Sequence, residues 1–304
     1  MKKTLSFLLA FAMVLSSFAA FAGAGTVAED VKIQTHKAYI AGMGDGNFDS
    51  QGKVTRQQVA RMIAKAIGLE EKAPKFEDAD KIGDWAKGSV GALQEAKIVV
   101  GDENGNFNPT KNVSRAELAT MLVKAYENIN GEIEAKDISF KDVADNAWYA
   151  KNVKKAATVG IVAGLDANTF DPNGEVTREQ TVAMVNRMLG LDKVEGAEEL
   201  KTEFKDVDKW SKWAKNDILV ASSDFEYRVV DGKKVIVDKE EEAKVEAATK
   251  AVAKAEESKL EKDIEAARKL VNALKDGEAK KALNNRLAAI EVELKVVGVS
   301  AINA

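Results

Sequence analysis

The sequence predicts a mainly α-helical protein in which three helix-loop-helix units form a ring with pseudo-threefold symmetry. One pattern recurs three times with fixed spacing, apolar residues follow each copy at helical intervals, and the two ends of the repeated region complement each other. The first copy lacks a front segment that the others have, and a matching segment follows the third copy. A C-terminal half-unit would therefore close the ring, ahead of a short β-hairpin and a small helical bundle or coiled-coil spacer.

The repeated pattern is centred on a phenylalanine. A glycine stands six residues before it, and a hydroxyl residue followed by an arginine begins seven residues after it. A glutamine or glutamate comes three residues after each hydroxyl, which is the capping-box spacing of a helix start. The members are Phe48, Phe107 and Phe170; Gly42, Gly101 and Gly164; Thr55, Ser114 and Thr177; and Arg56, Arg115 and Arg178.

The front segment begins at Phe76 and Phe140, and it reappears after the third unit at Phe204. Each copy carries a tryptophan in an equivalent place: Trp85, Trp148 and Trp213. Because an indole buries a large apolar area, we expect these tryptophans to be core plugs between helices, with one edge available to line a groove. We also expect residues 204–220 to pack beside the first unit, residues 31–69.

Composition shifts divide the chain into seven segments. Residues 1–22 form a signal peptide, with a basic start, a short apolar run and a cleavage site at Ala20-Phe21-Ala22. The remaining segments are the units at 23–70, 71–130 and 131–192, the closing half-unit and hairpin at 193–238, the bundle at 239–295, and a β-prone run at 296–304. In the bundle, we expect a first helix over about 240–257, then a capping box at Ser258 and Glu261 that opens a two-helix hairpin.

Charge and residue usage exclude several classes of function. The formal net charge of −4 gives no basic footprint for nucleic acid. The chain has no cysteine, which rules out thiol chemistry, and its single histidine, His36, disfavours a histidine-rich zinc site. His36 lies in a polar stretch, so we expect it to be solvated. No stretch after the signal peptide is long and apolar enough to span a membrane.

Three acidic loops resemble a calcium-binding loop only at their start. They begin at Asp45, Asp102 and Asp166. The first two lack the glycine and the glutamate that an EF-hand needs at its sixth and twelfth positions. These aspartates are therefore expected to be turn residues, and we predict no metal and no cofactor.

The repeats resemble S-layer homology (SLH) domains. The resemblance is carried by the front segment "FKDV" with its tryptophan, the loop "GDENGNFNP" and the helix start "SRAE", and it covers roughly residues 31–220. It implies a secreted protein of a Gram-positive-type cell wall or S-layer, anchored non-covalently through a secondary wall polysaccharide that bears pyruvate ketals. The helical C-terminal part resembles the spacers of S-layer proteins, and residues 296–304 resemble the opening strand of an Ig-like domain, as if the lattice-forming part were missing.

The arginines suggest where such a ligand binds. A cation in the first turn opposes the helix dipole by several tenths of a kcal/mol, so three in register need a reason. Free N–H groups at a helix start attract anions, and a guanidinium can grip a carboxylate in a planar fork. We therefore expect Arg56, Arg115 and Arg178 to bind ligand, with support from the neighbouring hydroxyl residues and tryptophans. The glycines most simply end the front helix in a left-handed cap, and they are also candidates for a close ligand approach.

The function predicted from the sequence is non-catalytic wall anchoring through a pyruvylated polysaccharide. Two alternatives remain open: the anchor of a wall-active hydrolase, and a structural envelope protein that assembles with other copies of itself. The small C-terminal bundle offers no nucleophile–base pairing, which argues against the hydrolase.

Overall fold

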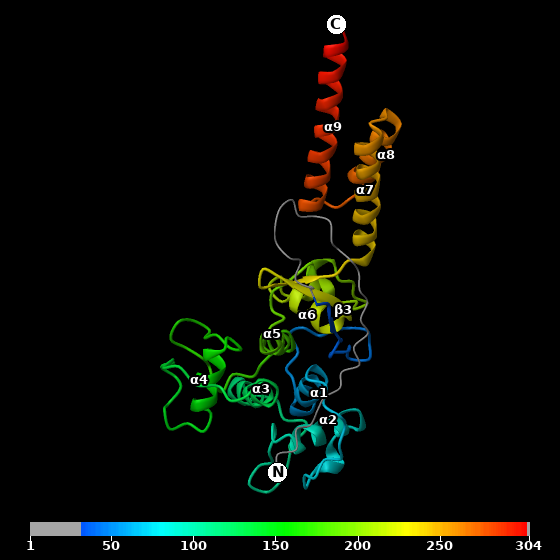
Figure 1. Ribbon diagram of the computed structural model, residues 1–304. Coiled ribbons are helices and arrows are strands. Elements are labelled where there is room, and N and C mark those ends of the chain that lie inside the picture. Colours follow the sequence, from blue (N-terminus) through cyan, green and yellow to red (C-terminus); the bar gives the residue numbers. More distant parts are fainter. Residues whose placement is uncertain (1–31, 303–304) are drawn as a thin grey trace, which may run out of the picture. The chain divides into compact units, whose positions relative to one another are not determined.

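The computed structural model describes residues 32–302, with side chains for residues 32–294 (Figure 1). The predicted signal peptide and the first residues of the first unit lie outside these residues. Helices dominate the described part and a small four-stranded sheet accompanies them, so the mainly α-helical class is confirmed. No helix within the described range is long and apolar enough to cross a membrane.

Three helices begin at the predicted arginines. They are α1 (Arg56–Ala66), α3 (Arg115–Asn130) and α5 (Arg178–Leu189). The capping boxes are confirmed: the Ser114 hydroxyl accepts the Glu117 N–H at 3.2 Å, and Glu117 Oε2 accepts the Ser114 N–H at 2.9 Å. The apolar stripes that follow the caps face the core, where residues such as Ile63, Leu118 and Val182 are fully buried.

Each capped helix packs against the helix of a front segment. α1 contacts α2 (Asp84–Glu95), α3 contacts α4 (Ala150–Thr158), and α5 contacts α6 (Lys215–Ser222). The capped helices α1, α3 and α5 also contact one another. A single large apolar core results, which draws side chains from all of these helices.

A closed cycle of backbone hydrogen bonds joins the three helix starts. Val113 N–H donates to Val54 O at 3.0 Å, Val176 N–H to Val113 O at 3.2 Å, and Val54 N–H to Val176 O at 3.4 Å. All three valines are buried, so these pairings satisfy backbone groups that water cannot reach. Each unit is thereby bonded to both of the others.

The segment from Phe204 completes the first unit, as predicted. The Phe204 ring lies 5.6 Å from the Phe48 ring, and Lys205 N–H donates to Gly46 O at 3.0 Å. The tryptophan that packs here is Trp210, whose ring centre is 5.6 Å from that of Phe48. A front segment from the far end of the repeated region thus occupies the place that the first unit leaves empty.

The β-hairpin is confirmed, and it belongs to a larger sheet than the sequence indicated. Strands β3 (Phe225–Val230) and β4 (Lys233–Ile236) are joined by Asp231-Gly232, both with positive φ, as a tight hairpin turn requires. β1 (Gln34–His36) pairs antiparallel with β3, and β2 (Val194–Glu195) pairs parallel with β4. Strands of three and two residues are too short to show an alternating pattern in the sequence.

His36 is buried, so the prediction of a solvated side chain is wrong. Pairing of β1 with β3 brings its ring 4.7 Å from the ring of Phe225, and Nε2 lies 2.9 Å from Val220 O. Burial lowers the pKa of His36 below its ordinary value, although the Val220 carbonyl and Asp224 oppose the shift. The polar neighbours in the sequence gave no sign of this, because the apolar partners come from the opposite end of the repeats.

The C-terminal helices form the predicted three-helix bundle. They are α7 (Lys239–Ser258), α8 (Glu261–Asn272) and α9 (Glu278–Ile302), and each contacts the other two. Val252, Val271 and Leu287 are fully buried between them. Leu294, by contrast, is exposed.

Two expectations about this bundle are wrong. Ser258 is the last residue of α7 rather than an N-cap, and Leu260 precedes α8 without a side-chain cap. The β-prone run from residue 296 continues α9 as far as Ile302. Extending an existing helix adds one hydrogen bond per residue without a new nucleation cost, which outweighs weak strand propensity.

The buried His36 predicts acid-sensitive stability. In the unfolded chain histidine takes up a proton near pH 6.5, whereas in the folded chain the lowered pKa delays protonation. The unfolded state therefore binds more protons as the pH falls from about 7.5 to 5.5, and the free energy of unfolding should drop by up to about 1.4 kcal/mol per pH unit below 6.5. Urea unfolding across this range measures the effect. His36→Gln should flatten the dependence, and equal slopes for the two proteins would contradict it.

Candidate functional site

A carboxylate holds each phenylalanine loop, and it is buried in two of the three units, as Asp78 and Asp206, and exposed in the third, as Asp142. Asp78 accepts the N–H groups of Phe107 and Asn108 at 2.7 and 2.8 Å. Asp206 does the same for Phe48 and Asp49 at 2.8 and 2.9 Å. Asp142 occupies the equivalent place in the third unit, where it accepts the Phe170 N–H at 2.9 Å. These aspartates were not among the predicted site residues, although each stands two residues after the phenylalanine that opens a front segment.

In two of the units, the loop bonds lower the pKa of the carboxylate. Burial alone would raise the pKa of Asp206, but the N–H donors of Phe48 and Asp49 outweigh it and hold that pKa below its ordinary value. Asp142 has a lowered pKa for the same reasons, with Phe170 and Asp171 as the donors. Asp206 and Asp142 are therefore structural anions that fix the loop backbone.

The predicted arginines reach across to the loop of another unit. The guanidinium carbon of Arg56 lies 5.0 Å from the ring centre of Phe107, and Nε donates to Phe107 O at 2.8 Å. Arg115 stands 5.0 Å from the ring centre of Phe170 and donates to Ala163 O at 2.7 Å. The loop carbonyls and ring faces stabilise each cation, so its position at the helix start has a structural reason without any ligand.

Arg178 closes this set of contacts. Its guanidinium lies 5.1 Å from the ring centre of Phe48 and donates to Ala41 O at 2.6 Å. The residue is only 6% exposed, and burial lowers its pKa to about 10, with Asp49 and Asp206 opposing the shift. Arg178 is thus the least accessible of the three candidate ligand contacts.

The expectation of free N–H groups at the helix starts is wrong. Arg115 N–H donates to Gly174 O at 2.9 Å, and Ala116 N–H donates to Pro172 O at 3.0 Å. The other two starts are occupied in the same way, Arg56 N–H by Lys111 O and Arg178 N–H by Gly52 O, both at 2.9 Å. The donors that would attract an anion are already used to join one unit to the next.

The repeated tryptophans are exposed, so the expectation that they are core plugs is also wrong. Trp85, Trp148 and Trp213 are 48%, 65% and 55% exposed. The next residue along is buried instead in two of the units, as Ala86 and Ala214. In these two units an alanine therefore occupies the core position that was expected for the tryptophan.

The repeated glycines and acidic loops have local structural roles. None of Gly42, Gly101 and Gly164 is among the residues with positive φ, so they are not left-handed caps. A Cβ on Gly164 would lie 2.1 Å from Asp166 O, and one on Gly101 would lie 2.9 Å from Gly105 C, so the folded loop requires glycine there. The loop aspartates accept backbone N–H groups, as expected for turn residues, with Asn104 N 2.9 Å from Asp102 Oδ1.

An open cavity of about 330 Å³ lies at the start of α3, and we name it the α3 cavity. It brings together two predicted ligand residues, Ser114 and Trp148, from different units. Neither Arg115 nor the other two repeated arginines line it. The lining residues are Lys111, Asn112, Ser114, Ala116, Glu117, Trp148, Tyr149, Asn173 and Glu175.

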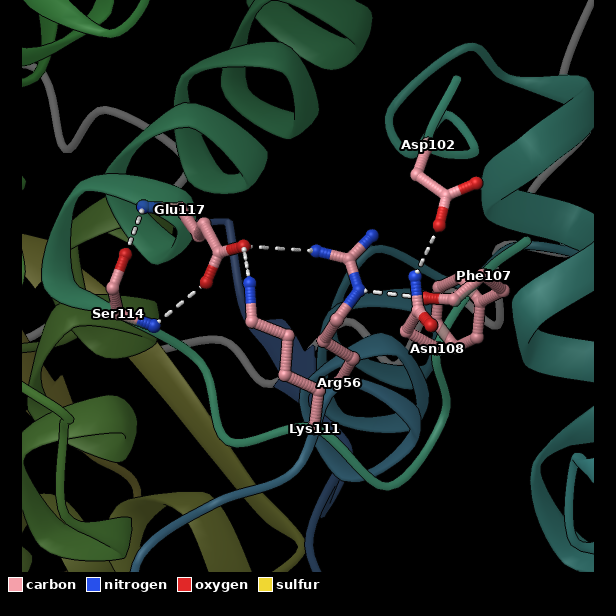
Figure 2. Close-up of polar contacts among 7 residues, drawn as sticks. All are labelled: Arg56, Asp102, Phe107, Asn108, Lys111, Ser114 and Glu117. Atoms are coloured by element: carbon pink, nitrogen blue, oxygen red, sulfur yellow. Dashed lines mark hydrogen bonds and ion pairs between the residues drawn. The ribbon is translucent and has the colours of Figure 1, made fainter. Parts of the chain in front are cut away.

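Glu117 organises the charges on one side of the α3 cavity (Figure 2). Its Oε1 lies 3.0 Å from Lys111 Nζ and 3.7 Å from Nη1 of Arg56. Burial would raise the pKa of Glu117, but the Ser114 N–H, Lys111 and Arg56 outweigh it and lower that pKa. Lys111 remains the accessible cation of this group, because its side chain is 60% exposed whereas that of Arg56 is 13% exposed.

Sequence comparison defines the class of the repeated units. The sequence model of the S-layer homology domain matches residues 75–119 and 139–182, within the predicted second and third units. The chain therefore carries S-layer homology domains, as the motifs predicted. These domains indicate a secreted, cell-wall-associated protein.

The chain is similar to surface and anchoring proteins of several bacteria. It is 36% identical over 163 residues to the surface-layer 125 kDa protein of Lysinibacillus sphaericus, covering 53% of this chain and 13% of that protein. It is 28% identical over 213 residues to the cellulosome-anchoring protein of Acetivibrio thermocellus, with 67% and 46% covered. It is also 34% identical over 152 residues to an uncharacterized cell wall amidase of Bacillus anthracis, with 49% and 28% covered. The chain thus spans less than half the length of these relatives, and together the matches support anchoring of surface proteins to the cell wall.

The inter-unit role of the arginines predicts that Arg178→Ala destabilises the protein. The change removes a buried side chain, leaves Ala41 O without its donor and uncovers the Phe48 ring. We expect a loss of about 2–4 kcal/mol in the free energy of unfolding, measured with urea. The matched control is Arg268→Ala in the bundle, where a surface ion pair with Glu291 is lost and about 0–1 kcal/mol is expected. Equal effects of the two changes would contradict the structural role.

Proposed function

We propose that this protein anchors a surface protein to the bacterial cell wall by binding an anionic, pyruvylated secondary wall polysaccharide in the α3 cavity. The observation that carries the proposal is the meeting of Ser114 and Trp148 in one cavity beside an accessible lysine. The volume of about 330 Å³ falls at the lower end of the roughly 300–1,000 Å³ typical of small-molecule sites. One or two sugar rings of a longer polymer would occupy it.

The chemistry of the cavity suits a sugar that carries an acid group. Trp148 offers an exposed indole face for the apolar side of a sugar ring. Asn112, Asn173 and Ser114 supply amide and hydroxyl groups that can bond sugar hydroxyls. Lys111 supplies a cation for a carboxylate such as that of a pyruvate ketal.

The arginines enter this proposal mainly as supports of the site. Arg56, Arg115 and Arg178 each already donate one nitrogen's N–H to a loop carbonyl, so only their remaining N–H groups are available to a ligand. In their present positions Arg56 and Arg115 hold the loops of Phe107 and Phe170, which lead into the cavity walls, whereas Arg178 holds the loop of Phe48 in the first unit. We also propose that the cyclic contacts of α1, α3 and α5 reflect a pseudo-threefold ring, closed by residues 204–220.

The proposed function is non-catalytic. The match to the relative named as a cell wall amidase covers 28% of that relative. The hydrolase activity of such a protein would lie in parts that the match does not cover. Self-assembly of several copies remains compatible with anchoring and is a separate property.

A pull-down with purified wall polysaccharide tests the proposal. The protein should bind the native polymer and lose most binding after chemical removal of the pyruvate ketals, because the carboxylate that faces Lys111 is then gone. Trp148→Ala should lower affinity for the native polymer by at least about tenfold, which is about 1.4 kcal/mol, without changing the melting temperature, since the indole is 65% exposed.

The control is Leu165→Ala, which removes another exposed apolar side chain away from the cavity and should bind normally. Equal binding of native and depyruvylated polymer would refute the proposed specificity. Absence of binding to either polymer would refute the function itself.

A further inference from the structure

The three helix starts are equivalent in backbone but differ in how much space they leave beside the tryptophan. At the start of α1, Gln57 Oε1 accepts the Gly83 N–H at 2.9 Å. At the start of α5, the buried Glu179 accepts from the Ser211 hydroxyl at 2.7 Å. Gly83 and Ser211 each stand two residues before a repeated tryptophan. The side chains of Gln57 and Glu179 therefore fill equivalent places. The equivalent residue at the start of α3 is Ala116, whose side chain ends at Cβ and lines the α3 cavity.

The same helix start differs in charge. Lys111 lines the α3 cavity, whereas the equivalent residues are Gly52 and Gly174. A Cβ on either glycine would lie 2.1 Å from a carboxylate oxygen of Asp49 or Asp171, so no side chain fits there without rearrangement. In the second unit Asn108 stands where the other units have Asp49 and Asp171. Its side-chain amide donates to a carboxylate oxygen of Asp102 at 2.9 Å. Because the Asn108 side chain points to Asp102, it leaves room for the side chain of Lys111.

A third difference lies in the aromatic wall. The residue after the tryptophan is the buried Ala86 or Ala214 in two front segments, but it is Tyr149 in the third. The ring centre of Tyr149 lies 5.3 Å from that of Trp148, and the rings are nearly perpendicular. Both rings line the α3 cavity, so together they offer a wider apolar surface than a tryptophan followed by alanine.

We propose that the α3 cavity is the single high-affinity ligand site among the three helix starts, and that Lys111 is the residue that recognises the acid group of the sugar. This inference rests on the proposed function and specifies where and how the polysaccharide binds. Ala116 provides the space, Trp148 and Tyr149 receive a face of the sugar, and Lys111 pairs with its carboxylate. Gln57 and Glu179 block the equivalent place at the other two starts.

The charge network permits Lys111 to change partners. Its ammonium group now pairs with Glu117, which also lies 3.7 Å from Nη1 of Arg56 and accepts the Ser114 N–H. When Lys111 turns to a ligand carboxylate, Arg56 and the Ser114 N–H still compensate the charge of Glu117 (Figure 2). The half-buried carboxylate is therefore not left unpaired, which would otherwise oppose binding.

Reciprocal substitutions test the inference, with titration calorimetry and a short pyruvylated fragment released from purified wall polysaccharide as the probe. Wild-type protein should bind one equivalent. Ala116→Gln should weaken binding at least tenfold, because the glutamine would fill the cavity as Gln57 does in the first unit. Lys111→Ala should weaken binding of the pyruvylated fragment at least tenfold but change binding of the depyruvylated fragment little. Lys141→Ala, which removes an exposed lysine elsewhere, is the matched control for charge and should bind as wild type does.

Indole N–H resonances locate the ligand independently of these variants. The chain has four tryptophans, each assignable by a Trp→Phe substitution. The fragment should shift the Trp148 signal and leave those of Trp85 and Trp213 in place. Circular dichroism and melting temperature confirm that each variant folds.

The outcomes separate the inference from the proposed function. Wild-type affinity in Ala116→Gln, a stoichiometry of two or three, or equal shifts at Trp85 and Trp213 would overturn the single-site inference while anchoring stands. If wild-type protein binds neither the polymer nor the fragment, the proposed function fails and this inference fails with it.

Discussion

The repeated part of this protein depends on a buried loop whose backbone and ring are held from two sides. At Phe48, the N–H groups of the loop bind Asp206, and the ring lies under the guanidinium of Arg178. A carboxylate or a guanidinium taken out of water alone would be costly. Here the anion accepts two N–H groups, and the cation has a carbonyl and an aromatic face. Because the aspartate comes from one part of the chain and the arginine from another, each loop joins three segments.

This arrangement separates the charges that build the protein from those available to a ligand. The repeated arginines donate hydrogen bonds to loop carbonyls, and the first N–H groups of the capped helices donate to neighbouring loops. Other side chains of the repeats face solvent: the three repeated tryptophans and, at the start of α3, Lys111. An anionic sugar would therefore meet a flexible ammonium group and an aromatic surface. The contacts of Arg56 and Arg115 with loop carbonyls join neighbouring units around that site.

Repetition with local variation explains how one helix start can differ from its equivalents without cost to the fold. The repeated geometry resides in the buried phenylalanines, the hydrogen-bonded valines and the aspartates that bind the loop N–H groups. Lys111 and Tyr149 lie at the rim of that framework, where a side chain can be lengthened or replaced while the loop remains fixed, and the buried Ala116 forms the inner end of the cavity. Gln57 and Glu179 vary in the same way: each accepts a hydrogen bond from a front segment and fills the space that Ala116 leaves open at the start of α3.

The sequence by itself determined the helix starts, the three units, the closing segment, the hairpin and the bundle, because local capping chemistry and apolar periodicity act over a few residues. It also singled out Ser114 and Trp148, which line the α3 cavity. Only the tertiary structure decided which way the long side chains point. His36 is buried because β1 meets a strand from almost two hundred residues away, and in two front segments an alanine takes the core position next to an exposed tryptophan. The arginines satisfy loops of other units rather than open helix ends, since their partners are set by contacts between units, which no spacing along the chain encodes.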